Sequence, residues 1–191
     1  MSLLSDIDKS LPDYYTLSNK TLIIVAHVRD ETIYFYDELG PNTTVILLSQ
    51  PKCYAIKQIF LEFMNNIGAT VIDIKNTESF DDNYRLDNRS VRIIMNLLKD
   101  YNYGKILTHP ETVTDPQNRE LFKLIKDYMK IRNKNNHYTY NMISNKIMPN
   151  GIQKGILELY CRASNKENKL DMELYMNYTN ISSRISGIKK L

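Results

Sequence analysis

The sequence predicts an α/β fold, a Rossmann-like three-layer sandwich in which a mostly parallel β-sheet carries helices on both faces. Along residues 21–130, short apolar runs alternate with longer amphipathic stretches, and this order is typical of parallel sheets built from right-handed crossovers. The first apolar run, residues 22–26, contains no polar position, as expected for a strand that is buried on both faces. The sequence shows no internal repeat that would indicate another architecture.

The individual elements are predicted from apolar spacing and from the turn residues at their ends. Strands are expected at residues 22–26, 44–48, 69–74 and 105–108, and helices at residues 31–39, 51–67, 88–101 and from Asp115 into the basic stretch 130–136. The helix at 51–67 has the clearest signal, because its apolar residues recur every three or four positions between Pro51 and Gly68. Asp115 followed by Pro116 favours a helix N-terminus, since aspartate caps a first turn and proline fits within it.

The length indicates a single domain over residues 1–191. A chain of 191 residues with 42% hydrophobic content is long enough for one sizeable core and short for two. Residues 1–20 are expected to form an N-terminal arm, and residues 137–191 a C-terminal part with weak periodicity. In that C-terminal part the sequence allows a strand at 137–142, a helix at 152–161 and a strand or a helix at 171–178 without separating these alternatives, and residues 184–190 are expected to form a solvated basic tail.

Composition and motifs argue against several classes of function. The net charge of +3 arises from 25 basic and 22 acidic residues, a balance that does not indicate nucleic-acid binding. Cys53 and Cys161 lie outside any CxxC or Cys/His pattern, which favours a reducing, cytoplasmic setting. We expect no secretory signal and no membrane span, because no apolar run approaches the roughly 20 residues that a span needs. The sequence has neither a glycine-rich phosphate loop nor a G-x-S-x-G elbow.

Four side chains suited to acid–base chemistry or metal binding follow predicted strands. His27 and Asp30 come after the first strand, and His109 and Asp115 come after the fourth. Because the carboxyl ends of parallel strands meet at one edge of the sheet, where open α/β folds bind ligands, we expect these residues to converge. Imidazole and carboxylate together suit zinc at neutral pH. The alternative is that the two aspartates cap helices and the two histidines are ordinary loop residues.

Two segments resemble motifs of the PIG-L/LmbE-like family of metal-dependent N-deacetylases. Residues 26–31, Ala-His-Val-Arg-Asp-Glu, are similar to the family's Ala-His-Pro-Asp-Asp-Glu motif. Thr108 and His109, followed by residues 115–118, Asp-Pro-Gln-Asn, are similar to its Thr-His and His-Pro-x-His segments. The resemblance covers most of residues 21–130. It implies the family's α/β fold, its zinc cofactor and its N-acyl amino-sugar or glycan-precursor substrates.

The resemblance also implies a role for each matching residue. His27, Asp30 and Asn118 stand at the positions of the three zinc ligands, and Arg29 stands at the position of the general base. Arginine stays protonated near neutral pH, and a neutral amide is a poorer zinc ligand than imidazole, so zinc is expected to bind weakly or not at all. Asp115 replaces the first histidine of the second motif and is a candidate substitute ligand or base.

Two hypotheses follow. In the first, the chain is a divergent PIG-L/LmbE-like protein with weakened or lost catalysis that binds an amino-sugar or glycan-precursor ligand. In the second, it is an active metal-dependent N-acyl amino-sugar deacetylase with a rearranged ligand set. Asp115 or Glu31 would then be the catalytic base, and Arg29 and His109 would contact the substrate or its oxyanion.

Overall fold

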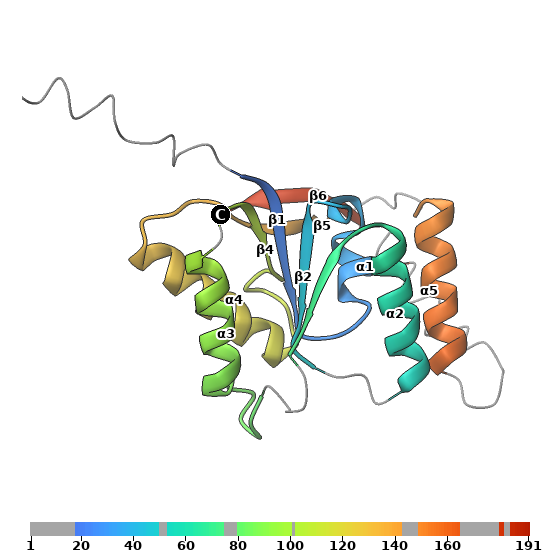
Figure 1. Ribbon diagram of the computed structural model, residues 1–191, viewed down its shortest axis with the longest axis horizontal. Coiled ribbons are helices and arrows are strands. Elements are labelled where there is room, and N and C mark those ends of the chain that lie inside the picture. The colour runs from blue at the N-terminus through green and yellow to red at the C-terminus, as the bar shows by residue number, and fades with distance from the viewer. Residues whose placement is uncertain are drawn as a thin grey trace, which may run out of the picture.

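The computed structural model describes residues 18–49, 53–74, 80–100, 102–142, 149–164, 180–181 and 184–191. Its strands are β1 (Ser18–Val25), β2 (Thr43–Leu47), β3 (Thr70–Asp73), β4 (Tyr103–Leu107), β5 (His137–Met142) and β6 (Ile185–Lys190). Its helices are α1 (Asp30–Tyr34), α2 (Tyr54–Asn66), α3 (Asn88–Asp100), α4 (Pro116–Ile131) and α5 (Gly151–Ser164), with a short 3-10 helix, η1 (Tyr36–Glu38), after α1. Strands and helices alternate along the chain (Figure 1), as the sequence predicts.

The six strands form one mostly parallel sheet with the order β3-β2-β1-β4-β5-β6, which confirms the predicted fold class. β1 to β5 run parallel to one another, and β6 pairs antiparallel with β5 at one edge. After β3, the chain crosses back to form β4 on the other side of β1. This reversal creates a topological switch point between β1 and β4, the place where open α/β sheets bind ligands.

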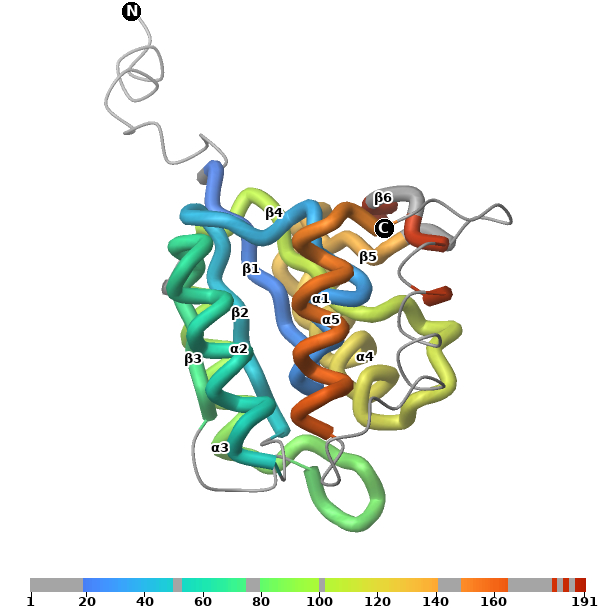
Figure 2. The backbone as a smooth tube through the Cα atoms, turned by 90° about the vertical axis from the view of Figure 1, so that its right-hand side faces the viewer, coloured from blue at the N-terminus to red at the C-terminus, as the bar shows by residue number. Residues whose placement is uncertain are grey.

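Helices cover both faces of the sheet and enclose two apolar cores. α1, α2 and α5 lie on one face, and α3 and α4 lie on the other (Figure 1 and Figure 2). Successive side chains of β1 alternate between the two layers: Ile23 packs with α2 and α5, whereas Leu22 and Ile24 pack with α3 and α4. The wholly apolar run predicted at 22–26 is therefore buried on both faces, as a three-layer fold requires.

Two predicted elements differ from the structure. The helix predicted at 31–39 ends at Tyr34, because Phe35 leaves the helical region at φ −127° and its side chain, 1% exposed, packs into the core. Residues 184–190 are not a solvated tail, since they contain β6, in which Ile188 lies opposite Tyr140 and packs on the core. Edge strands often carry lysines on their open side, as β6 does at its end, and this charge hides the strand pattern in the sequence.

The other C-terminal predictions have mixed outcomes. The strand at 137–142 is confirmed as β5, and the helix at 152–161 is confirmed as part of α5. The element predicted at 171–178 and most of the arm at 1–20 lie outside the described residues, and the single domain stays a prediction. Among the described residues, no helix combines the length and the apolar character needed to cross a membrane.

Candidate functional site

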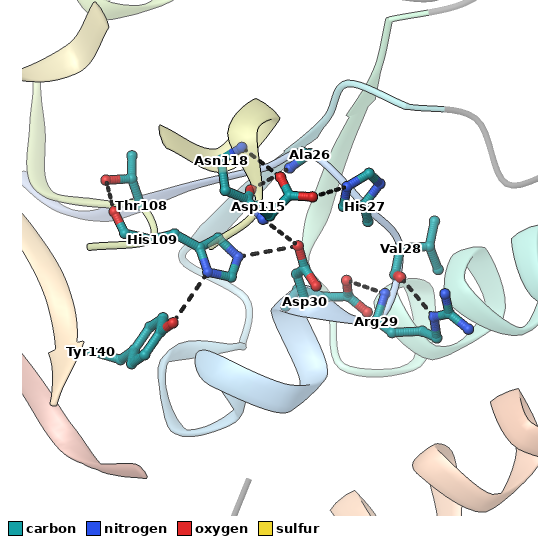
Figure 3. A network of polar contacts seen from close by, with 11 residues as sticks. Ala26, His27, Val28, Arg29, Asp30, Thr108, His109, Asp115, Asn118 and Tyr140 are labelled. Carbon is teal, nitrogen blue, oxygen red and sulfur yellow. Dashed lines mark hydrogen bonds and ion pairs between the residues drawn. The ribbon is translucent and has the colours of Figure 1, made fainter. Parts of the chain in front are cut away.

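The candidate site lies at the switch point between β1 and β4. His27 is in the loop that leaves β1, and Asp30 is the first residue of α1. His109 follows β4, Asp115 precedes α4, and Asn118 lies in the first turn of α4. Figure 3 shows these five side chains gathered in one group. The structure therefore brings together side chains from two segments that are far apart in the sequence.

Two local turns place the acidic residues. Asp115 is the N-cap of α4, and its Oδ1 accepts a hydrogen bond of 2.8 Å from the main-chain N–H of Asn118. Before α1, Arg29 adopts a left-handed conformation with φ 95°, which is uncommon for a residue other than glycine. The N–H of Asp30 donates to the carbonyl oxygen of His27 at 3.3 Å and closes this turn. The starts of two helices thus present Asp30 and Asp115 at the same edge of the sheet.

Asp30 is the centre of a hydrogen-bond network. Its Oδ2 lies 3.1 Å from Nε2 of His109 and accepts a hydrogen bond of 3.3 Å from Nδ2 of Asn118. Burial acts to raise the pKa of the Asp30 carboxyl, but the charges of His109 and His27 and the hydrogen bonds of His109 and Asn118 together outweigh it and hold the pKa below its ordinary value. Asp30 is therefore an ionised carboxylate at neutral pH, and its Oδ2 already has two partners.

The orientation of Asn118 is fixed by the main chain. The N–H of Ala26 donates to Oδ1 of Asn118 at 3.4 Å. Because a main-chain N–H can only donate, the amide oxygen must face Ala26 and the amide nitrogen must face the Asp30 carboxylate. If the amide were reversed, its nitrogen would face the N–H of Ala26 and its oxygen would face the Asp30 carboxylate. Asn118 is only 3% exposed, so water could not compensate for these lost hydrogen bonds. The position of the family's third zinc ligand therefore presents an N–H group instead of a lone pair.

His27 and Asp115 form a second, more accessible pair. Nε2 of His27 lies 3.4 Å from Oδ2 of Asp115, and the two side chains are 38% and 35% exposed. Ion pairs this exposed contribute little to stability. This pair is the accessible part of the site, whereas Asp30, with a side chain that is 14% exposed, lies beside the buried His109 and Asn118.

These contacts do not fit a zinc site built from the predicted ligands. Zinc needs at least three protein ligands whose lone pairs point to one place. His27 instead faces Asp115, Asp30 faces His109 and Asn118, and the Asn118 oxygen faces the main chain. Within the described ranges, no three or more His, Cys, Asp or Glu side chains come together as a metal-binding group. The geometry therefore does not support the ligand set His27, Asp30 and Asn118.

Arg29 does not face the carboxylates of the site. Its Nε donates to the carbonyl oxygen of Val28 at 3.1 Å, and Figure 3 shows its side chain turned away from Asp30 and Asp115. Its main-chain N–H donates to Oε2 of Glu31 at 2.8 Å. The substrate contact predicted for Arg29 stays a prediction, and a ligand would reach this guanidinium from outside the Asp30 network.

Glu31 is fully buried and connects α1 to α5. Its Oε1 accepts hydrogen bonds from the hydroxyl groups of Thr32 at 3.0 Å and Tyr160 at 3.1 Å. Burial raises the pKa of the Glu31 carboxyl to about 7. Both oxygens already accept hydrogen bonds and the side chain is 0% exposed, and the role of Glu31 as catalytic base stays a prediction. Consecutive helical residues point about 100° apart, which is why Glu31 leaves the face that Asp30 occupies.

The rings of Tyr34 and Tyr140 lie against His109. Its Nδ1 lies 3.4 Å from the hydroxyl of Tyr140, and the ring of Tyr34 meets it edge-on with 4.5 Å between centroids. His109 is 1% exposed and contacts Asp30, and its substrate contact stays a prediction. The sequence held a signal for Tyr34, which lies four residues after Asp30 on the same face of α1. Tyr140 belongs to the tyrosines of the C-terminal part that could line a sugar-binding surface or the core, and its place beside His109 depends on the pairing of β5 with β4.

Comparisons with known proteins show the fold and leave the reaction open. No protein-family model matches the sequence, and no curated protein sequence matches it significantly. Among solved structures, one similar protein is GalB, the 4-carboxy-2-hydroxymuconate hydratase of Pseudomonas putida KT2440. It has 12% identity and a TM-score of 0.55, and the match covers 90% of this chain and 96% of the hydratase.

A second similar structure is a triple mutant of a deacetylase involved in the teicoplanin biosynthetic pathway. It has 10% identity and a TM-score of 0.56, and the match covers 90% of this chain and 98% of the deacetylase. One neighbour is a hydratase and the other a deacetylase, so the likeness does not identify a reaction. It shows that the chain has a Rossmann-like α/β fold, consistent with the fold of LmbE/PIG-L-like proteins.

Proposed function

We propose that the chain is a divergent PIG-L/LmbE-like protein that binds an N-acyl amino sugar or glycan precursor, with deacetylase catalysis weakened or lost. The motif resemblance at residues 26–31 and 115–118 supports the family relation, and the fold similarity to a deacetylase is consistent with it. The observation that carries the proposal is the orientation of Asn118. Its amide N–H donates to the Asp30 carboxylate at the position where the family has its third zinc ligand.

The remaining side chains favour binding over hydrolysis. A hydrolase needs a group that accepts a proton next to the reacting bond. Arg29 cannot accept a proton, Glu31 is enclosed, and Oδ2 of Asp30 already has two partners, which leaves Asp115 as the accessible carboxylate for this role. The accessible His27–Asp115 pair offers polar contacts to the hydroxyl and amide groups of a sugar.

A second candidate function is an active, metal-dependent N-acyl amino-sugar deacetylase with a rearranged ligand set. The observation that favours it is the distance of 3.4 Å between Nε2 of His27 and Oδ2 of Asp115, since zinc binds both kinds of group. In this arrangement Asp115 would take the place of Asn118 as a ligand. Asp30 would ligate through Oδ1, because its contacts with His109 and Asn118 both involve Oδ2.

Metal content distinguishes the two functions. Protein purified without chelator and equilibrated with zinc is expected to retain well under one zinc ion per chain in elemental analysis, because Asn118 offers a donor where zinc needs a lone pair. We expect it to release no acetate from N-acetylglucosamine, and calorimetry should show binding of this sugar in the presence of EDTA. Full zinc occupancy with turnover would reject the proposal and establish the second function.

A gain-of-function variant tests the role of Asn118 directly. Asn118→His combined with Arg29→Asp is expected to raise zinc retention toward one ion per chain, because imidazole replaces the amide and a positive charge leaves the loop. Asn102→His, at an exposed position before β4, is the matched control and should leave the zinc content unchanged. Equal zinc retention in the wild type and both variants would show that Asn118 does not govern metal binding.

A further inference from the structure

The turn that presents Asp30 contains a residue in an unfavourable conformation. Arg29, the N-cap of α1, has φ 95° and ψ −28°, whereas N-cap residues ordinarily have extended backbone angles. A Cβ atom disfavours this left-handed region, so the conformation persists only where surrounding contacts stabilise it. The bond of 3.3 Å from the N–H of Asp30 to the carbonyl oxygen of His27 is long and holds the turn only weakly. A stronger contact is needed at Arg29 itself.

Glu31 supplies such a contact. Its Oε2 accepts a hydrogen bond of 2.8 Å from the main-chain N–H of Arg29. An N–H group at the start of a helix has no partner within the helix, and an acidic side chain of the first turn can satisfy it by reaching back, as in one half of a capping box. Glu31 therefore holds the main chain of the residue that directly precedes Asp30.

Helix α5 holds Glu31 in turn. The hydroxyl of Tyr160 donates to Oε1 of Glu31 at 3.1 Å, and both side chains are 0% exposed. Gln153, seven residues earlier on the same face of α5, donates from Nε2 to the carbonyl oxygen of Thr32 at 3.0 Å. Figure 2 shows α5 alongside α1. Two hydrogen bonds from one face of α5 thus fix the two residues that follow Asp30.

We propose that Glu31 is a positioning residue of the candidate site. Supported by Tyr160, it stabilises the left-handed turn at Arg29 that brings Asp30 to within 3.1 Å of His109. Glu31 does this through the main chain, since its carboxylate contacts the N–H of Arg29 and no side chain of the Asp30 network. The consequence for sugar binding rests on the function proposed above, whereas the position of Asp30 can be tested without a ligand.

The ring N–H of His109 reports the position of Asp30. Nε2 of His109 carries a proton, because its partner, the Asp30 carboxylate, can only accept. His109 is 1% exposed, so this proton is protected from water and should give an NMR signal downfield of the main-chain amides. The signal depends on the hydrogen bond to Asp30. Its loss or displacement therefore shows that Asp30 has moved.

Two substitutions of Glu31 distinguish its hydrogen bonds from its size. Glu31→Leu removes the acceptor for the Arg29 N–H, and the His109 signal is expected to leave its wild-type position. Glu31→Gln should keep the signal, because the amide oxygen can accept from Arg29 while the amide nitrogen donates to the hydroxyl of Tyr160. Glu38→Leu is the matched control. Glu38 lies in η1 and pairs with Lys105 at 2.7 Å, so its loss should leave the His109 signal unchanged.

A glycine at position 29 tests whether the turn is what Glu31 stabilises. Glycine adopts φ 95° without strain, so the turn in Arg29→Gly no longer needs Glu31. The double variant Arg29→Gly, Glu31→Leu is expected to regain the wild-type His109 signal. If it lacks the signal as Glu31→Leu does, Glu31 supports α1 as a whole and does not position the turn.

Two further outcomes bear on the positioning role. An unchanged signal in a folded Glu31→Leu protein would refute it outright. If Glu31→Leu does not fold, Tyr160→Phe replaces it, because this variant removes only the bond from α5. The His109 signal should then be displaced in Tyr160→Phe and restored when Arg29→Gly is added, and an unchanged signal in Tyr160→Phe would refute the role.

Sugar titrations separate this inference from the proposed function. If the turn holds Asp30 in place only part of the time, the apparent dissociation constant rises in inverse proportion to that fraction. We expect N-acetylglucosamine to bind about three- to tenfold more weakly to Glu31→Leu and as well as in the wild type to Glu31→Gln. If the wild type does not bind this sugar, the proposed ligand class is wrong, and the His109 signals alone decide the role of Glu31. If Glu31→Leu loses the signal but binds the sugar normally, the function stands and the effect of Glu31 on binding is wrong.

Discussion

Replacing Asp30 by alanine is expected to lower the free energy of unfolding by about 3 kcal/mol. The substitution removes the acceptor that His109 and Asn118 share, and these side chains are 1% and 3% exposed. Their N–H groups would lose a partner in a space with little access to water, and each buried donor without a partner costs about 1–3 kcal/mol. Denaturant unfolding of the metal-free protein measures this change.

The sign of the change distinguishes the observed network from a metal site. Where acidic side chains gather to bind a cation, removing one of them from the metal-free protein relieves repulsion and raises stability. Here Asp30 has its partners within the chain, so the substitution should lower stability. Asp30→Asn keeps the shape and one acceptor oxygen, and we expect it to cost about 1 kcal/mol. An Asp30→Ala variant as stable as the wild type would contradict the network.

A surface substitution controls for nonspecific effects of removing a carboxylate. Glu111 lies 3.1 Å from Lys126, but the two side chains are 69% and 57% exposed. Glu111→Ala is therefore expected to leave the free energy of unfolding within about 0.5 kcal/mol of the wild type. A loss comparable to that of Asp30→Ala would mean that overall charge, and not the buried network, determines the effect.

The central part of the fold could be predicted because its signals are local. The apolar run at 22–26 indicates a strand covered on both faces, and Gly68, at φ 75° just after α2, marks the end of that helix. Asp115 and Pro116 indicate the start of α4 through the chemistry of a single turn. β6 could not be predicted in this way, because what makes it a strand is its pairing with β5 and not its own charged sequence.

The contrast between local signals and distant partners also explains which parts of the site could be predicted. The order of strands and helices was enough to expect His27, Asp30, His109 and Asp115 at one edge of the sheet. The orientations of the neighbouring side chains depend on hydrogen-bond partners that are far away in the sequence. The amide of Asn118 is oriented by Ala26, 92 positions away in the sequence, and Glu31 is held by Tyr160, 129 positions away. A motif gives the position of a side chain, whereas its hydrogen-bond partners decide whether it is a ligand, a base or a structural link.

Because of His137, the free energy of unfolding is expected to fall by about 3 kcal/mol as the pH is lowered from 6.5 to 4. The side chain is 3% exposed on β5, with Nε2 2.6 Å from the hydroxyl oxygen of Thr108. Burial lowers the pKa of His137 to about 4, and the charge of Lys126 adds to the shift. In the unfolded chain His137 binds a proton near pH 6.5, whereas in the folded protein it binds one only near pH 4. The contribution is therefore complete above pH 6.5 and is lost as the pH falls toward 4.

Comparing the wild type with His137→Gln isolates this residue, because every other titrating group is present in both proteins. Glutamine keeps an N–H donor for Thr108, whose own hydroxyl donates to the carbonyl oxygen of His109 at 3.2 Å. The difference in unfolding free energy should shift by about 3 kcal/mol in favour of the variant as the pH falls from 6.5 to 4. Thr139→Val, also buried on β5 and without a titrating group, should differ from the wild type equally at every pH. A pH-independent difference for His137→Gln would mean that the folded protein protonates His137 freely.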